Sequence, residues 1–146
     1  MFGWLVVVVS LAVVYLAWGL AAGDPLAMLR AMLGVLTDVG RLSGASWYVL
    51  ALIAVRVLFL AAALEESLFR GLLQPWLQRR LPVSTAIGIT SMVFSLMHVY
   101  PVAYPAGLIF GVIAGILRVR RSTTATFAMH VLTDVTLLVV AVLIRA

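Results

Sequence analysis

Long apolar runs without charge constrain this chain more than any other feature of its sequence. The first of them, from Trp4 to Ala22, contains no charged side chain. About 20 such residues span the hydrocarbon core of a bilayer as a helix. Over the whole chain 65% of residues are hydrophobic and 10% are charged, whereas a soluble domain carries about 25% charged residues. The sequence therefore predicts an integral membrane protein.

The residues after this first run favour a helix that lies in the membrane interface. A cleavable signal peptide is the alternative for the run itself, but no positive residue precedes Trp4, so we expect a retained helix. Asp24-Pro25 is typical of an N-cap followed by proline at the first helical position. Leucines then recur at helical spacing as far as Val39. An interfacial helix fits this segment, with a shallow second span as the alternative.

Four further helical stretches follow, each bounded by proline, glycine or arginine. Their expected ranges are 47–78, with Pro75 bending the end, then 83–100, 104–117 and 123–144. The expected fold class is therefore all-α, a polytopic membrane helix bundle of about five transmembrane helices plus one interfacial helix. We expect a single domain over 1–146, with the N-terminal span and interfacial helix in 1–45 and the core in 46–146.

The distribution of arginine predicts the orientation in the membrane. The connections after the second and fourth spans hold Arg79, Arg80, Arg118, Arg120 and Arg121, and the opposite side holds Arg30, Arg41 and Arg145. By the positive-inside rule, the N-terminus and the arginine-rich loops face the cytoplasm, and the chain is a multi-pass protein of the cell membrane. The lipid bilayer is one expected partner. Nucleic acid is not expected, because no basic stripe with interleaved aromatic residues occurs. The sequence does not indicate an oligomeric state.

Ionisable residues are concentrated inside the predicted spans. A charged group at bilayer depth costs several kcal/mol and usually marks function. Both histidines of the chain and three of its five acidic residues belong to this set, which consists of Glu65, Glu66, His98, His130 and Asp134. The chain has no cysteine, so a metal site would use histidine and carboxylate ligands. The concentration predicts a functional site.

Helical spacing predicts how these residues pair. Glu66 and Arg70 are four residues apart, so they share a helix face and can form an ion pair that gives structural support. Glu65 is rotated by about 100° from Glu66, which allows it to face a cavity. His130 and Asp134 are also four residues apart, which places a carboxylate beside an imidazole.

Three helices would then contribute to one catalytic site. Glu65 would be the general base that takes a proton from water, and His98 would share or orient that water. His130, held by Asp134, would stabilise the oxyanion on the scissile carbonyl. The alternative for either histidine alone is a hydrogen-bonded packing role.

A glycine stripe on the fourth predicted span has a structural interpretation. Gly107, Gly111 and Gly115 are spaced four residues apart. Small residues at this spacing let the backbone of a second helix approach closely. We expect a tight helix contact there.

Three short motifs resemble those of one protein family. Residues 65–70, EESLFR, resemble the EExxxR motif of the CPBP family, which includes the type II CAAX prenyl proteases and bacteriocin-processing, Abi-like relatives. Residues 94–98, FSLMH, resemble its FxxxH motif. Residues 130–134, HVLTD, resemble its HxxxN or HxxxD motif. The resemblance covers roughly residues 60–140, and the first 45 residues carry none of it.

This resemblance implies an intramembrane endopeptidase of metallo- or glutamate type. Its water-activating residues would be Glu65 and His98, and its oxyanion side would be formed by His130 with position 134. A divalent metal such as zinc is a further option, with Glu65, His98, His130 and Asp134 as candidate ligands. Asp134 stands where the family commonly has Asn and has no N–H to donate, so we expect it to fix the tautomer of His130 or to ligate a metal.

The expected substrate is a peptide bond in a membrane-associated protein, a prenylated protein or a peptide precursor. Two other functions fit the same residues. A non-catalytic bacteriocin-immunity or binding protein would retain the fold without cleavage. A small transporter or proton relay would use the buried carboxylates and histidines for ion movement.

Overall fold

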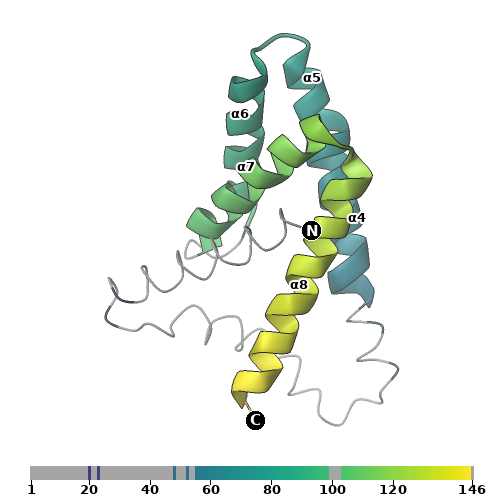
Figure 1. The fold of residues 1–146 in the computed structure, drawn as a ribbon, viewed down its shortest axis with the longest axis vertical. Helices are drawn as coiled ribbons and strands as arrows, with labels where there is room; N and C mark the ends of the chain where they lie inside the picture. Colours follow the sequence, from purple (N-terminus) through teal and green to yellow (C-terminus); the bar gives the residue numbers. More distant parts are fainter. Residues whose placement is uncertain are drawn as a thin grey trace.

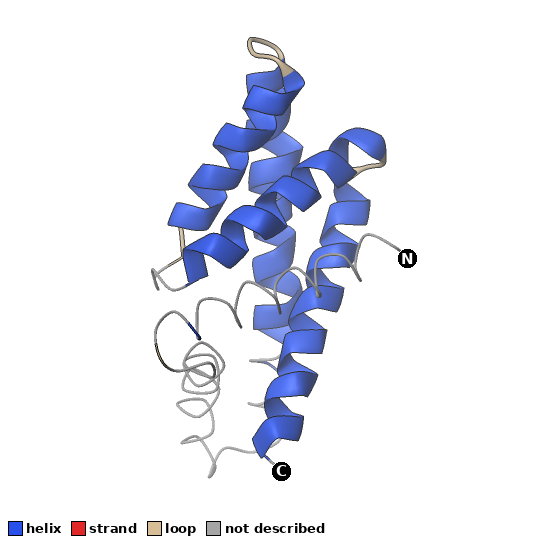
Figure 2. Ribbon diagram, turned by 60° about the vertical axis from the view of Figure 1, so that its left-hand side comes forward, coloured by secondary structure: helices blue, strands red, loops and turns tan. Residues whose placement is uncertain are grey.

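The computed structural model of this chain is helical throughout the part that it describes. That part comprises Leu20, Gly23, Tyr48, Leu52 and residues 55–98 and 103–145. Every regular element in these residues is a helix (Figure 2), which confirms the predicted all-α class. The expected first span and interfacial helix fall on residues 4–41, of which only Leu20 and Gly23 are described. Both elements stay predictions.

One continuous helical stretch carries the two adjacent glutamates. It consists, end to end, of η1 (Arg56–Ala61), α4 (Ala62–Glu66), η2 (Ser67–Leu73) and α5 (Gln74–Gln78). The helix expected over 47–78 is thereby confirmed in its described part. η1 and η2 are π-helical, a rare wide winding that recurs at functional sites. Glu65 and Glu66 end α4, directly before the second π-helical segment.

Pro75 leaves one backbone carbonyl of this stretch without its backbone donor. At the end of η2 the N–H of Gln74 donates to the carbonyl of Phe69, five residues back. The next residue in that pattern is Pro75, which has no N–H for the carbonyl of Arg70. The Nε–H of Arg118 donates to this carbonyl at 3.0 Å. An arginine from another helix thus replaces the missing bond, and the helix continues through Pro75 to Gln78.

Three more helices complete the described bundle. They are α6 (Val83–Leu96), α7 (Tyr104–Arg120) and α8 (Thr123–Arg145). Pro82 precedes α6 and Pro105 lies in the first turn of α7, where a missing N–H costs no helical hydrogen bond. The helix α6 ends at Leu96, four residues before the expected position, and α7 continues three residues beyond its expected end at Leu117.

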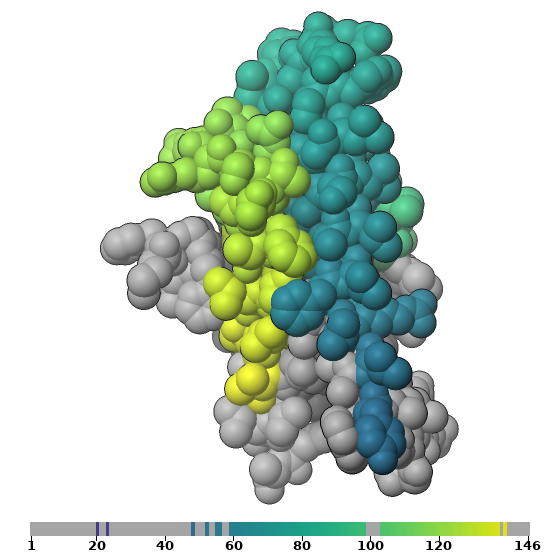
Figure 3. Space-filling model, turned by 90° about the vertical axis from the view of Figure 1, so that its right-hand side faces the viewer, coloured from purple at the N-terminus to yellow at the C-terminus, as the bar shows by residue number. Residues whose placement is uncertain are grey.

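The helices form two pairs. α6 and α7 form an antiparallel hairpin that packs against η2 and α5, and α8 returns along α4 and η1 (Figure 1). Figure 3 shows α8 lying beside the first helical stretch on one face of the molecule. The turn after α5 forms the tip of the molecule, and the turn after α7 lies lower, beside the first helical stretch (Figure 1). There Arg118 of α7 contacts Arg70 of η2.

Glycines bring α7 into direct backbone contact with α6, as the stripe predicts. A Cβ built on Gly111 would lie 2.8 Å from the Cβ of Ser91 and 2.9 Å from its Cα. A Cβ on Gly115 would lie 2.8 Å from Cγ2 of Ile87. Gly107 approaches the Cα of Ser95 in the same way, at 3.2 Å. A Cβ less than 3.0 Å from backbone is essentially never found, so the close packing depends on glycine at position 111.

An aromatic cluster fills the space between the pairs. Phe94 of α6 contacts Phe69 of η2 edge to face, with ring centroids 5.2 Å apart, and stacks on Phe110 of α7 at 5.6 Å. Met129 of α8 and two alanines of α7 complete this cluster. The rings bury large apolar areas in favourable geometries.

Polar side chains are buried beside the aromatic cluster, and many apolar side chains are exposed. The largest fully buried side chains are Arg70, Gln74, Glu66, Thr90, Thr126, Thr133 and Ser91. Leucines on the outside, such as Leu64 and Leu72, are 70% and 64% exposed. Within the described ranges, no helix combines the length and the apolar character that a membrane span requires. The membrane-spanning bundle therefore stays a prediction.

Candidate active site

The predicted carboxylates and imidazole converge on His130. Its Nδ1 lies 3.0 Å from Oε1 of Glu66, and its Nε2 lies 3.8 Å from Oε2 of Glu65 and 3.7 Å from Oδ2 of Asp134. The glutamates come from α4, and His130 and Asp134 come from one face of α8. The structure thus brings together four of the predicted site residues around one imidazole, which is 9% exposed.

Glu66 is the hydrogen-bond partner of His130. Its Oε1 accepts from both Nη1 of Arg70 and Nδ1 of His130, each at 3.0 Å. We expected Asp134 to fix the tautomer of His130, but 3.7 Å is too long for a hydrogen bond. The expected Glu66–Arg70 pair is confirmed, and the same carboxylate also orients His130, with Nδ1 as the donor and Nε2 turned toward Glu65 and Asp134.

Arg70 is held rigidly inside the bundle. Its guanidinium carbon lies 4.4 Å from the ring centroid of Phe94, and its Nη2 donates to the carbonyl of Gly111 at 3.3 Å. The side chain is fully buried. A buried cation of this kind needs a counter-ion, which is Glu66. Arg70 therefore fixes the position of Glu66, and Glu66 fixes the ring of His130.

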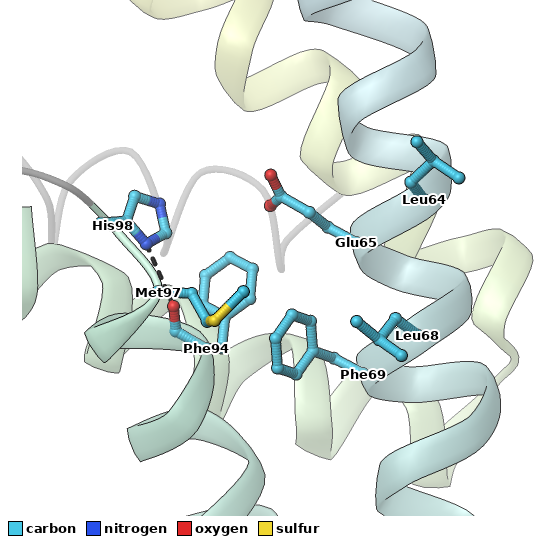
Figure 4. Close-up of a pocket in the computed structure, with 7 residues that line it drawn as sticks. All are labelled: Leu64, Glu65, Leu68, Phe69, Phe94, Met97 and His98. Atoms are coloured by element: carbon cyan, nitrogen blue, oxygen red, sulfur yellow. Dashed lines mark hydrogen bonds between the residues drawn. The ribbon is translucent and has the colours of Figure 1, made fainter.

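A pocket of about 360 Å³ opens beside this cluster. Its lining consists of Leu64, Glu65, Leu68, Phe69, Phe94, Met97 and His98 (Figure 4). The carboxylate of Glu65 extends into the pocket from one wall, and His98 lies on the opposite wall (Figure 4). The side chain of Glu65 is 38% exposed. As predicted from their angular separation, Glu65 faces the cavity while Glu66 points inward.

His98 lies just beyond the end of α6, and its ring is also oriented. Its Nδ1 donates to the carbonyl of Phe94 at 3.1 Å, so in the neutral ring Nε2 carries the lone pair. The ring of Phe94 contacts both imidazoles, with centroid distances of 5.1 Å to His98 and 6.1 Å to His130. Counting residues along the helices predicts different depths for the two histidines. In the structure both rings lie against Phe94.

The predicted divalent metal would need several ligands within reach of one point. In the part of the chain that the structure describes, no group of three or more His, Asp or Glu side chains is arranged to hold a metal ion. One nitrogen of His130 and one of His98 are hydrogen-bonded, to Glu66 and to a backbone carbonyl, which leaves Nε2 of each ring for other contacts. The metal stays a prediction.

Gln74 belongs to the support of the site, and the sequence interpretation missed it. It is fully buried, and its Nε2 donates to the carbonyl of Gly115 at 3.0 Å. Arg70, one turn earlier, makes the equivalent bond to Gly111. Gln74 lies four residues after Arg70, and Gly115 lies four residues after Gly111, so each pair shares a helix face. This matching spacing was present in the sequence.

The fold and the site together define an all-α protein in which carboxylates and imidazoles can activate water beside an apolar pocket. A family model described as type II CAAX prenyl endopeptidase Rce1-like matches residues 45–136, which is more than half of the chain and includes every residue of the site. The chain therefore belongs to the Rce1-like family of type II CAAX prenyl endopeptidases, which confirms the resemblance of the three motifs. Comparison with curated proteins and with solved structures gave no match.

Membership in this family has two general consequences. It implies an endopeptidase of the CAAX type, as the sequence predicts, and a protein associated with membranes. All three motifs lie inside the matched range.

Proposed function

We propose that this chain is an intramembrane endopeptidase that hydrolyses a peptide bond of a membrane-associated substrate, with Glu65 as the general base. The observation that carries the proposal is the position of Glu65. Its carboxylate extends into a pocket opposite His98 and also lies 3.8 Å from His130. A water molecule in that pocket would contact a base and an imidazole at once.

The first step in the proposed mechanism is attack by water. Glu65 removes a proton from the water while Nε2 of His98 accepts the second O–H as a hydrogen bond. The resulting hydroxide adds to the scissile carbonyl and forms a tetrahedral intermediate. Glu65 then returns the proton to the leaving nitrogen, and the C–N bond breaks to give a carboxylic acid and an amine. One glutamate therefore serves as base and then as acid.

His130 is suited to stabilise the oxyanion in this scheme. Its Nδ1 is engaged by Glu66, so only Nε2 is available to the substrate. In the doubly protonated ring Nε2 becomes a donor, and the carboxylates of Glu66 and Asp134 supply compensating negative charge while Glu65 holds the proton of the water. A fixed donor that needs no reorganisation during the reaction is an effective stabiliser of developing charge.

The surfaces around the pocket support an apolar substrate in a lipid environment. Leu64 and Met97 line the pocket and are 70% and 66% exposed, and Glu66 and Arg70 are buried inside the bundle. Such an arrangement places ionisable groups inside and apolar side chains against lipid. We propose as substrates membrane-bound peptide precursors or prenylated proteins, in a cell-membrane bundle whose arginine-rich turns face the cytoplasm. Reporter fusions that place residues 118–121 outside the cell would contradict that orientation.

The decisive test is cleavage by purified protein in lipid nanodiscs. Fluorogenic peptides with and without a prenyl group would be incubated with the wild type, with Glu65→Gln and with Ser67→Ala, an exposed neighbour that serves as the matched control. We expect Glu65→Gln to lose at least about 100-fold in rate and Ser67→Ala to keep the wild-type rate. Cleavage at the wild-type rate by Glu65→Gln would refute the assignment. Parallel reactions with a chelator test the predicted metal, since loss of activity that zinc restores would establish one.

A further inference from the structure

The turn between α7 and α8 is a concentrated positive surface. It carries Arg118, Arg120 and Arg121 within four positions, and the chain has no acidic residue from 67 to 133. Arg120 and Arg121 are exposed. The ion pairs found among the described residues all lie in the site around Glu65, Glu66 and His130. The positive charge of the turn is therefore not neutralised by the described part of the chain.

Arg118 joins this surface to the active site. Its Nε–H donates to the carbonyl that Pro75 leaves open on Arg70, and a guanidinium has further N–H donors on its two terminal nitrogens. The side chain is partly exposed, and the described residues supply no hydrogen bond to these terminal nitrogens. One edge of the guanidinium thus holds the catalytic helix, while the other is available to an anion.

A short series of contacts continues from there to the imidazole. The side chain of Arg70 binds Glu66 at 3.0 Å, and Glu66 binds His130 at 3.0 Å. The carbonyl of Arg70 is therefore bound by Arg118 of the arginine turn, and its guanidinium is bound by Glu66 of the site. A ligand that fixes Arg118 would restrict the same residue that positions Glu66.

The end of α5 and the turn after it have the side chains of a membrane interface. Trp76 is 47% exposed, and the guanidinium carbon of Arg80 lies 4.4 Å from its ring centroid. Tryptophan and arginine together are typical of the headgroup layer. Phosphates of anionic lipids attract juxtamembrane arginines. The chemistry that fits the turn is therefore a lipid phosphate.

We propose that Arg118, Arg120 and Arg121 bind the headgroup of an anionic phospholipid, and that this lipid stabilises the active site through the contact of Arg118 with Arg70. The inference rests on the membrane placement in the proposed function. It adds a lipid requirement that the cleavage mechanism does not contain.

The test compares bilayers of different charge. Wild type, Arg120→Gln/Arg121→Gln and the control Arg56→Gln would be placed in nanodiscs of phosphatidylcholine, with or without phosphatidylglycerol. Arg56 is exposed and lies at the other end of the first helical stretch. We expect phosphatidylglycerol to raise the thermal unfolding midpoint of the wild type and of Arg56→Gln by about 3 °C or more. The double variant should gain less than half of that shift.

Three results would overturn the inference. Equal midpoints of the wild type in both lipids, or a full shift in the double variant, would refute the lipid site while leaving the proposed cleavage untouched. Protein that does not enter nanodiscs of either composition would refute the membrane placement itself, and with it both proposals. Cleavage rates in the same discs provide a second readout, and the rate should rise with phosphatidylglycerol only where the midpoint rises.

Discussion

Glu66→Gln tests whether one carboxylate holds the interior of the site together. Glu66 and Arg70 are 1% and 0% exposed, and the two are joined at 3.0 Å. Removing one partner of a buried ion pair costs about 3–5 kcal/mol, because the other charge is left without compensation. The contact of Arg70 with the ring of Phe94 at 4.4 Å offsets up to about 2 kcal/mol of this. We therefore expect Glu66→Gln to lower the free energy of unfolding by about 3 kcal/mol.

A double-mutant cycle separates this explanation from simple loss of packing. The free energies of unfolding of wild type, Glu66→Gln, Arg70→Met and the double variant would be measured by reversible denaturation in mixed micelles. Removing both charges relieves the unpaired cation, so the double variant should be more stable than the sum of the single effects predicts, by at least about 1.5 kcal/mol. It should still lack activity, because His130 has lost its carboxylate partner. Additive costs, within about 0.5 kcal/mol, would refute the reasoning.

Two further changes test the packing and the orientation of the site. Gly111→Ala puts a Cβ 2.9 Å from the backbone of Ser91, so we expect it to lower the free energy of unfolding by about 1–3 kcal/mol. The control Gly88→Ala has nothing within 4 Å of its Cβ and should not lower it. Equal losses in the two variants would contradict the close contact. Asp134→Asn leaves the hydrogen bond from the imidazole to Glu66 intact, so the cleavage rate should change by less than about 10-fold, and a loss beyond about 100-fold would show that Asp134 has the larger role.

Residue spacing predicted most of the described fold, because each helix is bounded by residues with a local effect. Pro82 and Pro105 mark where α6 and α7 begin, and the glycine stripe predicted the contact between these two helices. The winding of the first helix could not be predicted. The bond from Arg118 to the carbonyl that Pro75 leaves open on Arg70 joins residues 48 positions apart, and residue spacing does not predict such a contact.

In the site, too, contacts within one helix were predictable and contacts between helices were not. Pairs four residues apart on one helix were predicted correctly, as with Glu66 and Arg70. Asp134 lies beside His130 as its spacing predicts, at 3.7 Å, but the hydrogen bond of the imidazole goes to Glu66, 64 residues earlier in the chain, which the spacing did not predict. To predict whether Glu66 or Asp134 binds the imidazole, one must know how α4 packs against α8. Helical periodicity within one helix does not give that packing.

The two π-helical segments on either side of α4 have a consequence for how this chain tolerates length changes. A helix of that winding contains an extra residue in each turn, so losing one residue from η2 would return the segment to ordinary α-helical winding. The helix would survive such a deletion, and Gln74 would keep nearly the same angle to Glu65, because the wider winding absorbs the extra residue. A residue lost from α4 would instead turn the segments on its two sides by about 100° relative to each other. A change of one residue in length is therefore better tolerated in η2 than in α4.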